Sequence, residues 1–154
     1  MRMLYVDVKG QVTPVCSRSH ITYQFHLEQA ASKLCIRFAY TPKRLVDLER
    51  SREMILDSID KYTAPEHNEA VKSRWERFLP LQNLITFSVD DPERHRGAGH
   101  RHDPVQELYL SESGASPGLV SGQLPGGWWK VTLSLHAIVT ERCDYELQVW
   151  EEGE

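Results

Sequence analysis

Apolar and polar residues alternate with a period of two near both ends of this chain, a pattern that few folds accommodate. In residues 20–27 the apolar members of the alternation are Ile21, Tyr23, Phe25 and Leu27. Successive side chains of a strand point to opposite faces of a sheet, so this segment is predicted to be a strand with one buried face. Residues 34–40 repeat the pattern, and residues 29–33 are predicted to form a hairpin turn between the two strands.

The same alternation returns in further short segments, which are residues 4–8, 83–89, 105–111, 128–139 and 145–149. Turns that contain glycine or proline separate most of these segments from one another. Many short strands punctuated by turns are typical of antiparallel sandwiches. The predicted fold is therefore mainly β, an antiparallel and jelly-roll-like β-sandwich of about seven to nine strands.

Residues 43–79 have a helical pattern instead. Thr63, Pro65 and Glu66 form a capping box with a proline in the first turn of the predicted helix. The apolar face of this helix, which Pro80 ends, comprises Val71, Trp75, Phe78 and Leu79. A preceding helix is predicted from Leu45, Leu48, Ile55 and Ile59. We therefore expect one domain of residues 1–154 with a helical insertion at residues 43–79, packed on the sandwich or across its open end.

Composition and charge disfavour some classes of partner. The 18 Lys and Arg residues lie among 22 Asp and Glu residues and the formal charge is −4, which disfavours nucleic acid. No apolar run approaches the ~18 residues of a membrane-spanning helix, so a membrane is not an expected partner. Cys16, Cys35 and Cys143 are odd in number and form no CxxC pair, which favours reduced thiols and a cytoplasmic location.

The segment RHRGAGHRHD, residues 94–103, holds three of the seven histidines. One hypothesis is a divalent-metal site, which would make the protein a small metal-dependent hydrolase. Its candidate metal ligands are His95, His100, His102 and Asp103, with His136 as a further one. Side chains two apart on a strand point the same way, as two ligands of one ion require. None of these residues has a diagnostic spacing for a complete set of three or more ligands.

The competing hypothesis for this segment is a polar loop with a structural role. In such a loop the Arg96 guanidinium pairs with a nearby carboxylate, and Gly97 and Gly99 permit tight backbone turns. The candidate carboxylate partners are Asp90, Asp91 and Asp103. This hypothesis needs no bound metal.

The adjacent tryptophans of the predicted strand 128–139 point to opposite faces. Alternation places Trp129 in the core and Trp128 on a polar face. The other residues of that polar face are Lys130, Thr132, Ser134 and His136. An aromatic ring on a polar strand face is a candidate platform for a carbohydrate-type ligand. The candidate ligand contacts are Trp128, His136 and Arg96; the alternative is that Trp128 packs under a helix or loop of the insertion.

Four motifs follow one another in the second half of the chain. They are Asp91-Pro92 with Arg96-Gly97, the segment 110–118 that ends in Pro117-Gly118, a Gly-x-Leu-Pro-x-Gly-x-Trp segment at residues 122–128 with Trp129 beside it, and a Cys/Tyr-x-Leu-x-Val edge at residues 143–149. This pattern resembles the amino-terminal β-rich domain that precedes the catalytic domain in CehA/McbA-type metallohydrolases of the PHP superfamily. The resemblance covers roughly the last 70 residues, and reaches the rest only through strand order and the position of the insertion.

The resemblance implies an accessory domain rather than an enzyme, because the metal ligands of that family belong to the PHP domain that follows. We therefore expect a non-catalytic β-sandwich module for binding or assembly, with no cofactor. Its candidate partners are a metallohydrolase or a small ligand, and a homodimer through an exposed strand edge is a further expectation. A divalent metal belongs only to the alternative hydrolase hypothesis.

Overall fold

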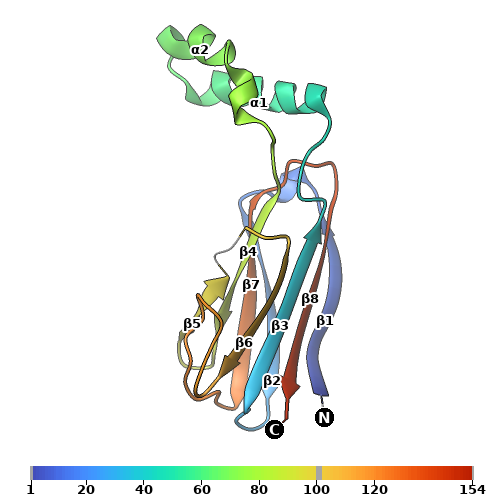
Figure 1. Cartoon of the computed structure of the whole chain (residues 1–154), viewed down its shortest axis with the longest axis vertical. Coiled ribbons are helices and arrows are strands. Elements are labelled where there is room, and N and C mark those ends of the chain that lie inside the picture. Colours follow the sequence, from blue (N-terminus) through green and yellow to red (C-terminus); the bar gives the residue numbers. More distant parts are fainter. Residues whose placement is uncertain (1, 100–101, 154) are drawn as a thin grey trace.

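The computed structural model describes residues 2–99 and 102–153. In this part of the chain the strands are β1 (Arg2–Val12), β2 (Ser19–Leu27), β3 (Lys33–Thr41), β4 (Leu84–Asp90), β5 (His95–Gly99), β6 (Val105–Ser111), β7 (Gly127–Ala137) and β8 (Cys143–Glu152). They form two antiparallel four-stranded sheets, in the orders β1-β8-β3-β6 and β2-β7-β4-β5, which lie face to face (Figure 1). Two facing four-stranded sheets with these strand orders form a jelly-roll sandwich, so the predicted fold class is confirmed.

The core lies between the two sheets and contains the apolar members of each alternation. Phe25 and Leu27 from β2 meet Leu34, Ile36 and Phe38 from β3 in one buried cluster. The strand that crosses the middle of its sheet, β7, contributes Trp129, Val131, Leu133 and Leu135, each at most 1% exposed. The period-two pattern therefore identified the buried face of these strands correctly, because alternation is a local property of extended backbone.

The predicted hairpin between β2 and β3 is wrong. β2 pairs with β7, whereas β3 pairs with β8 and β6 in the other sheet. The residues between them carry the chain from one sheet to the other, and an isolated bridge joins Ala31 to Leu124 on the way. Two consecutive strands can bury their apolar faces equally well by pairing in one sheet or by facing one another across a core. Alternation alone therefore does not identify the hydrogen-bonded neighbour of a strand.

The helical insertion is present, and it extends from the end of the sandwich at which β3 ends and β4 begins (Figure 1). Its helices are α1 (Leu48–Tyr62), α2 (Pro65–Lys72) and the 3₁₀ helix η2 (Trp75–Phe78). Ile55 and Ile59 of α1 are buried as predicted, but Leu45 precedes the helix and Leu48 is exposed. No helix in the described residues is both long and apolar enough to span a membrane.

The predicted capping box does not form. Thr63 is the C-cap of α1, where its backbone N–H donates to the Ile59 carbonyl oxygen, so it is not available as the N-cap of the next helix. Ala64 takes that position instead, with Pro65 in the first turn, and no side chain caps α2. The single helix predicted up to residue 79 is also wrong, because α2 ends at Lys72 and η2 follows as a separate turn.

The remaining elements are a short helix between β1 and β2 and the edge strand β5. The 3₁₀ helix η1 (Pro14–Cys16) links β1 to β2 at the end of the sandwich that carries the insertion. Within the segment predicted as a loop or metal site, residues 95–99 form β5. The outer edge of β5 is covered by the loop before β7: the Ala98 N–H donates to the Gly118 carbonyl oxygen, and the Val120 N–H to the Arg96 carbonyl oxygen. None of the three cysteines forms a disulfide.

Candidate ligand-binding face

The outer surface of the sheet β2-β7-β4-β5 is rich in polar side chains, and we call it the polar face. Its members, which alternate with core residues along each strand, are His20, Thr22, Gln24 and His26 of β2, Trp128, Lys130, Thr132, Ser134 and His136 of β7, Thr86, Ser88 and Asp90 of β4, and His95 of β5. The helical insertion leaves much of it accessible, since Gln24, His26, Trp128 and Lys130 are all exposed. The polar face is therefore a surface from which a ligand can be contacted.

Hydrogen bonds between neighbouring strands orient several side chains of the polar face. The hydroxyl groups of Thr22 and Thr132 lie 3.1 Å apart. The His20 Nδ1 atom lies 3.1 Å from the Ser134 hydroxyl oxygen, and Thr86 Oγ1 lies 2.8 Å from His136 Nε2. Cross-strand pairs of this kind restrict side-chain rotamers. The face thus presents hydroxyl and imidazole groups in partly fixed positions.

Trp128 is the large apolar side chain of this face, with 58% of its surface exposed. Its ring meets the His26 imidazole edge-on, at a centroid distance of 5.0 Å and an interplanar angle of 63°. By contrast, Trp129 is fully buried and its Nε1–H donates to the Pro125 carbonyl oxygen. Trp128 is near the start of β7, whereas the insertion adjoins the other end, where Ala137 pairs with Leu84. The alternative in which the insertion covers Trp128 is therefore wrong.

Arg96 does not belong to the polar face, because its side chain points inward and has no exposed surface. Its Nη1 donates to Asp91 Oδ2 at 2.9 Å and to the Gln123 carbonyl oxygen at 2.8 Å. Its Nε and Nη2 donate to the carbonyl oxygens of Val120 and Gly122. The guanidinium also lies over the Trp129 ring, 5.7 Å from its centroid. Arg96 thus fastens the loop before β7 to the turn after β4 and cannot serve as a ligand contact.

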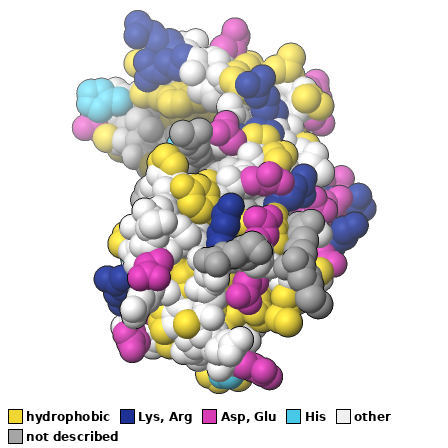
Figure 2. Space-filling view, turned by 60° about the horizontal axis from the view of Figure 1, so that its bottom comes forward, with side chains coloured by type: hydrophobic (Ala, Val, Ile, Leu, Met, Phe, Trp, Pro, Cys, Tyr) yellow, Lys and Arg dark blue, Asp and Glu magenta, His cyan; other side chains and the backbone are white. Residues whose placement is uncertain are grey.

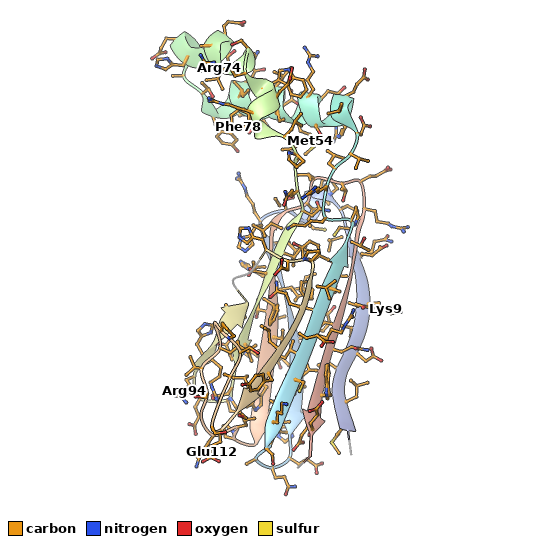
Figure 3. The ribbon with its side chains drawn as sticks, in the orientation of Figure 1. Lys9, Met54, Arg74, Phe78, Arg94 and Glu112 are labelled. Carbon is orange, nitrogen blue, oxygen red and sulfur yellow. The ribbon has the colours of Figure 1, made fainter. Side chains whose placement is uncertain are left out.

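Asp91 is the carboxylate of this turn. Its Oδ1 accepts from the backbone N–H groups of Glu93 and Arg94, both at 2.7 Å. Burial raises the pKa of Asp91, but these two N–H groups and the Arg96 guanidinium outweigh burial and hold the pKa below its ordinary value. The pairing of Arg96 with Asp91 agrees with the structural hypothesis for this segment, and it lies at the end of the sandwich opposite the insertion, near Arg94 in Figure 3.

The structure does not bring together the predicted metal ligands that it describes. His95 is hydrogen-bonded to Asp90, with 2.9 Å between Nδ1 and Oδ1. The other end of β5, at Gly99, is about 13 Å from His95 at ~3.3 Å per residue. His102 and Asp103 follow that end in the sequence, and both are exposed. His100 lies outside the described residues. Within residues 2–99 and 102–153, no three His, Cys, Asp or Glu side chains are placed to hold a metal ion.

A groove and a smaller pocket are among the hollows at the insertion end of the molecule. A groove of about 390 Å³ is lined mostly by apolar side chains of the insertion, among them Met54, Ile59 and Phe78 (Figure 3). A smaller pocket of about 250 Å³ opens on the polar face beside Arg18, His20 and His136. Sequence analysis missed Arg18, because it precedes the alternating segment and no local pattern distinguishes it from other surface arginines.

Charged side chains are mixed on the surface of the protein. On the face shown in Figure 2, lysines and arginines lie among aspartates and glutamates, over both the sandwich and the insertion. Several are paired, for example Arg37 with Glu107 and Glu146 on the outer face of the other sheet. This distribution matches the scattered charge of the sequence.

No protein-family model and no curated protein matches this chain. Among solved structures, the periplasmic inhibitor of g-type lysozyme from Aeromonas hydrophila is 11% identical over 96% of this chain and 85% of its own, with a TM-score of 0.40. A protein from Sulfurospirillum deleyianum is 7% identical over 97% of this chain and 99% of its own, with a TM-score of 0.38. The CUB1-EGF-CUB2 region of human MASP-1/3 is 9% identical over 90% of this chain and 41% of its own, with a TM-score of 0.28.

At such low identities and TM-scores, these similarities assign neither a family nor a ligand to this chain. The class that the fold of the described residues defines is an eight-stranded jelly-roll β-sandwich with a helical insertion.

Proposed function

We propose that this chain is a non-catalytic binding module that holds a carbohydrate-type ligand on its polar face. The observation that carries the proposal is the position of Trp128, whose ring is largely exposed on a strand face that is otherwise polar. A buried ring would be explained by packing, but Trp128 sits outside the core that Trp129 fills. An exposed flat ring provides a surface on which the C–H groups of a sugar ring pack.

The neighbours of Trp128 supply the polar contacts that a sugar requires. Lys130 and Thr132 follow it on the same face of β7, and Gln24 and Thr22 stand opposite them on β2. Their amine, amide and hydroxyl groups donate to or accept from sugar hydroxyl groups. Ligand sites commonly combine one apolar platform with a few such polar groups.

The motif resemblance supports a more specific version of the same proposal, in which the module accompanies a PHP-type metallohydrolase. Asp91, Arg96 and Gly97 belong to the shared motifs, and each has a structural role in this chain. Motifs that maintain a fold suit an accessory domain, whose contribution is to bind or to assemble. The cytoplasmic location stays a prediction from the sequence.

Tryptophan fluorescence tests the carbohydrate proposal. The protein is titrated with hexasaccharides of glucose, xylose and N-acetylglucosamine, and a saturable change in emission is expected for at least one. The Trp128→Ala variant should fold normally and lose this response. Trp75→Ala, which removes a half-buried ring from the insertion, serves as the matched control and should keep it. Binding by Trp128→Ala with unchanged affinity, or silence with every sugar, would refute the proposal.

A further inference from the structure

A pocket at the other end of the polar face has the composition of an anion site. Its volume is about 250 Å³, and its lining residues are Arg18, Ser19, His20, Ser134, Leu135 and His136. It lies where β2 begins and β7 ends, next to the insertion, and the Arg18 Nη2 atom is 3.4 Å from the Tyr62 hydroxyl oxygen of α1. The lining comprises one guanidinium, two imidazoles and two hydroxyl groups, and it includes no carboxylate.

Arg18 is the fixed positive charge of this pocket, because a guanidinium is always protonated in proteins. It forms no salt bridge with any of the described acidic residues, whereas Arg37, Arg94, Arg96 and Arg142 all do. Its side chain donates instead to the neutral Tyr62 hydroxyl. Most of its hydrogen-bonding capacity therefore remains available, and a planar guanidinium suits two oxygen atoms of one anion.

The two imidazoles are held in place by hydroxyl groups of neighbouring strands. His20 uses Nδ1 toward Ser134, and His136 uses Nε2 toward Thr86. The second nitrogen of each ring makes no hydrogen bond to the described residues. On β7, Ser134 and His136 are two positions apart and so share the polar face, and His20 is the cross-strand partner of Ser134. The pocket thus gathers donors from two strands around the Arg18 guanidinium.

The backbone of Arg18 supports a role for its side chain. Its φ is 65°, and it is the non-glycine residue with positive φ in the described part of the chain. A side chain in this conformation is sterically unfavourable, and glycine would adopt it more easily. The turn is kept by the Arg18 N–H, which donates to the Leu135 carbonyl oxygen at 2.7 Å. A strained backbone that carries a cation into a pocket is a reason to look for function there.

We propose that this pocket binds a tetrahedral oxyanion, namely phosphate or sulfate, either free or as a group on a larger molecule. Arg18 contacts two oxygen atoms of the anion, and His20 and His136 donate to the others. The site is separate from Trp128: His136 is eight positions after Trp128 along β7, about 26 Å at ~3.3 Å per residue. The proposal goes beyond carbohydrate binding and does not depend on it.

Side-chain NMR of the histidines tests this proposal, since histidines elsewhere on the polar face serve as internal controls for those of the pocket. Inorganic phosphate is titrated at constant pH and ionic strength. We expect saturable shifts of the His20 and His136 resonances and none at His26 or His95, which lie elsewhere on the same face. Equal shifts at all four histidines would show general ionic effects and overturn the proposal.

Variants separate the pocket from the overall charge of the protein. Arg18→Gly should fold at least as well, because glycine favours φ 65°, and should lose at least tenfold in phosphate affinity. Lys9→Ala removes the same charge from β1 in the other sheet (Figure 3) and should bind as the parent does. His136→Asn provides a second loss-of-binding variant. Unchanged phosphate binding by Arg18→Gly and His136→Asn would overturn the site.

A second arm identifies the source of the anion. Glucose 6-phosphate and inorganic phosphate are compared by the same histidine shifts. Equal affinities identify the free ion as the ligand, and tighter binding of the sugar phosphate identifies a phosphorylated molecule; each supports the pocket. Because the readout is His20 and His136 and not tryptophan emission, failure here and failure of the Trp128 proposal are distinguishable.

Discussion

The Arg96 guanidinium lies 2.9 Å from the Asp91 carboxylate, and the two side chains are 0% and 3% exposed. This buried pair connects the turn after β4 with the loop that leads into β7. The chain therefore enters β7 at a defined position, directly before the tryptophans, one of which is buried under Arg96 and one of which is open to solvent. A structural ion pair thereby supports the position of the candidate sugar platform.

Replacing Arg96 by methionine should destabilise the fold by about 3–5 kcal/mol, because it leaves the Asp91 charge buried and removes the donor from three carbonyl oxygens. Urea unfolding followed by circular dichroism measures the change. Arg94→Met is the control. Arg94 is exposed and approaches the same carboxylate only to 3.9 Å, so its replacement should lower the free energy of unfolding by at most about 1 kcal/mol. Similar losses in the two variants would contradict the assigned role of Arg96.

The Asp91 carboxyl group should make the free energy of unfolding depend on pH. Its folded-state pKa lies below the ordinary value of 3.8, so its contribution to the free energy of unfolding is complete above about pH 4 and is lost as the pH falls through the lowered pKa. The Asp91→Asn variant has no carboxyl group at this position, so it lacks this contribution at every pH. The stability difference between parent and variant should therefore be largest near neutrality and shrink below about pH 4. Urea unfolding at several pH values checks this, and a difference that stays constant to low pH would refute it.

Gly97→Ala should be strongly destabilising. Gly97 has a φ of 112°, and an added Cβ would stand 2.1 Å from the Gly118 carbonyl oxygen. The β5 edge and the loop that covers it would have to separate, at a cost of about 2 kcal/mol or more. Gly114→Ala is the matched control, since its nearest contact is the Tyr109 hydroxyl at 3.3 Å and its φ is not positive. Thermal unfolding compares the two, and an equal melting temperature for both variants would contradict the prediction.

Purified protein without a histidine tag should contain no stoichiometric zinc or manganese. His95 is engaged by Asp90 at one end of β5, and His102 and Asp103 follow its other end, so these candidates do not converge. Elemental analysis by mass spectrometry, with a His100→Ala/His102→Ala variant beside the parent, makes the measurement. One bound transition metal per chain, lost in the variant, would restore the metal-dependent hydrolase hypothesis and call for a screen of phosphoesters.

The predictable part of the candidate site was the direction of its side chains. Alternation placed Trp128 and His136 on the polar face and Trp129 in the core, and the structure agrees. The polar-loop hypothesis named three candidate carboxylate partners for Arg96, of which Asp91 is the actual partner. Arg18 could not be predicted, because its relation to His136 depends on how the start of β2 meets the end of β7.

The buried face of each strand is a local property, since backbone geometry alone makes successive side chains point in opposite directions. It could therefore be read from residues 20–27 or 128–139 without knowledge of the rest of the chain. Sheet membership is different: β2 and β3 are neighbours in sequence, yet they pair in separate sheets, and His20 meets Ser134 across 114 positions. Such contacts follow from the packing of the whole core, because many arrangements bury the same apolar faces and only long-range backbone pairing distinguishes them.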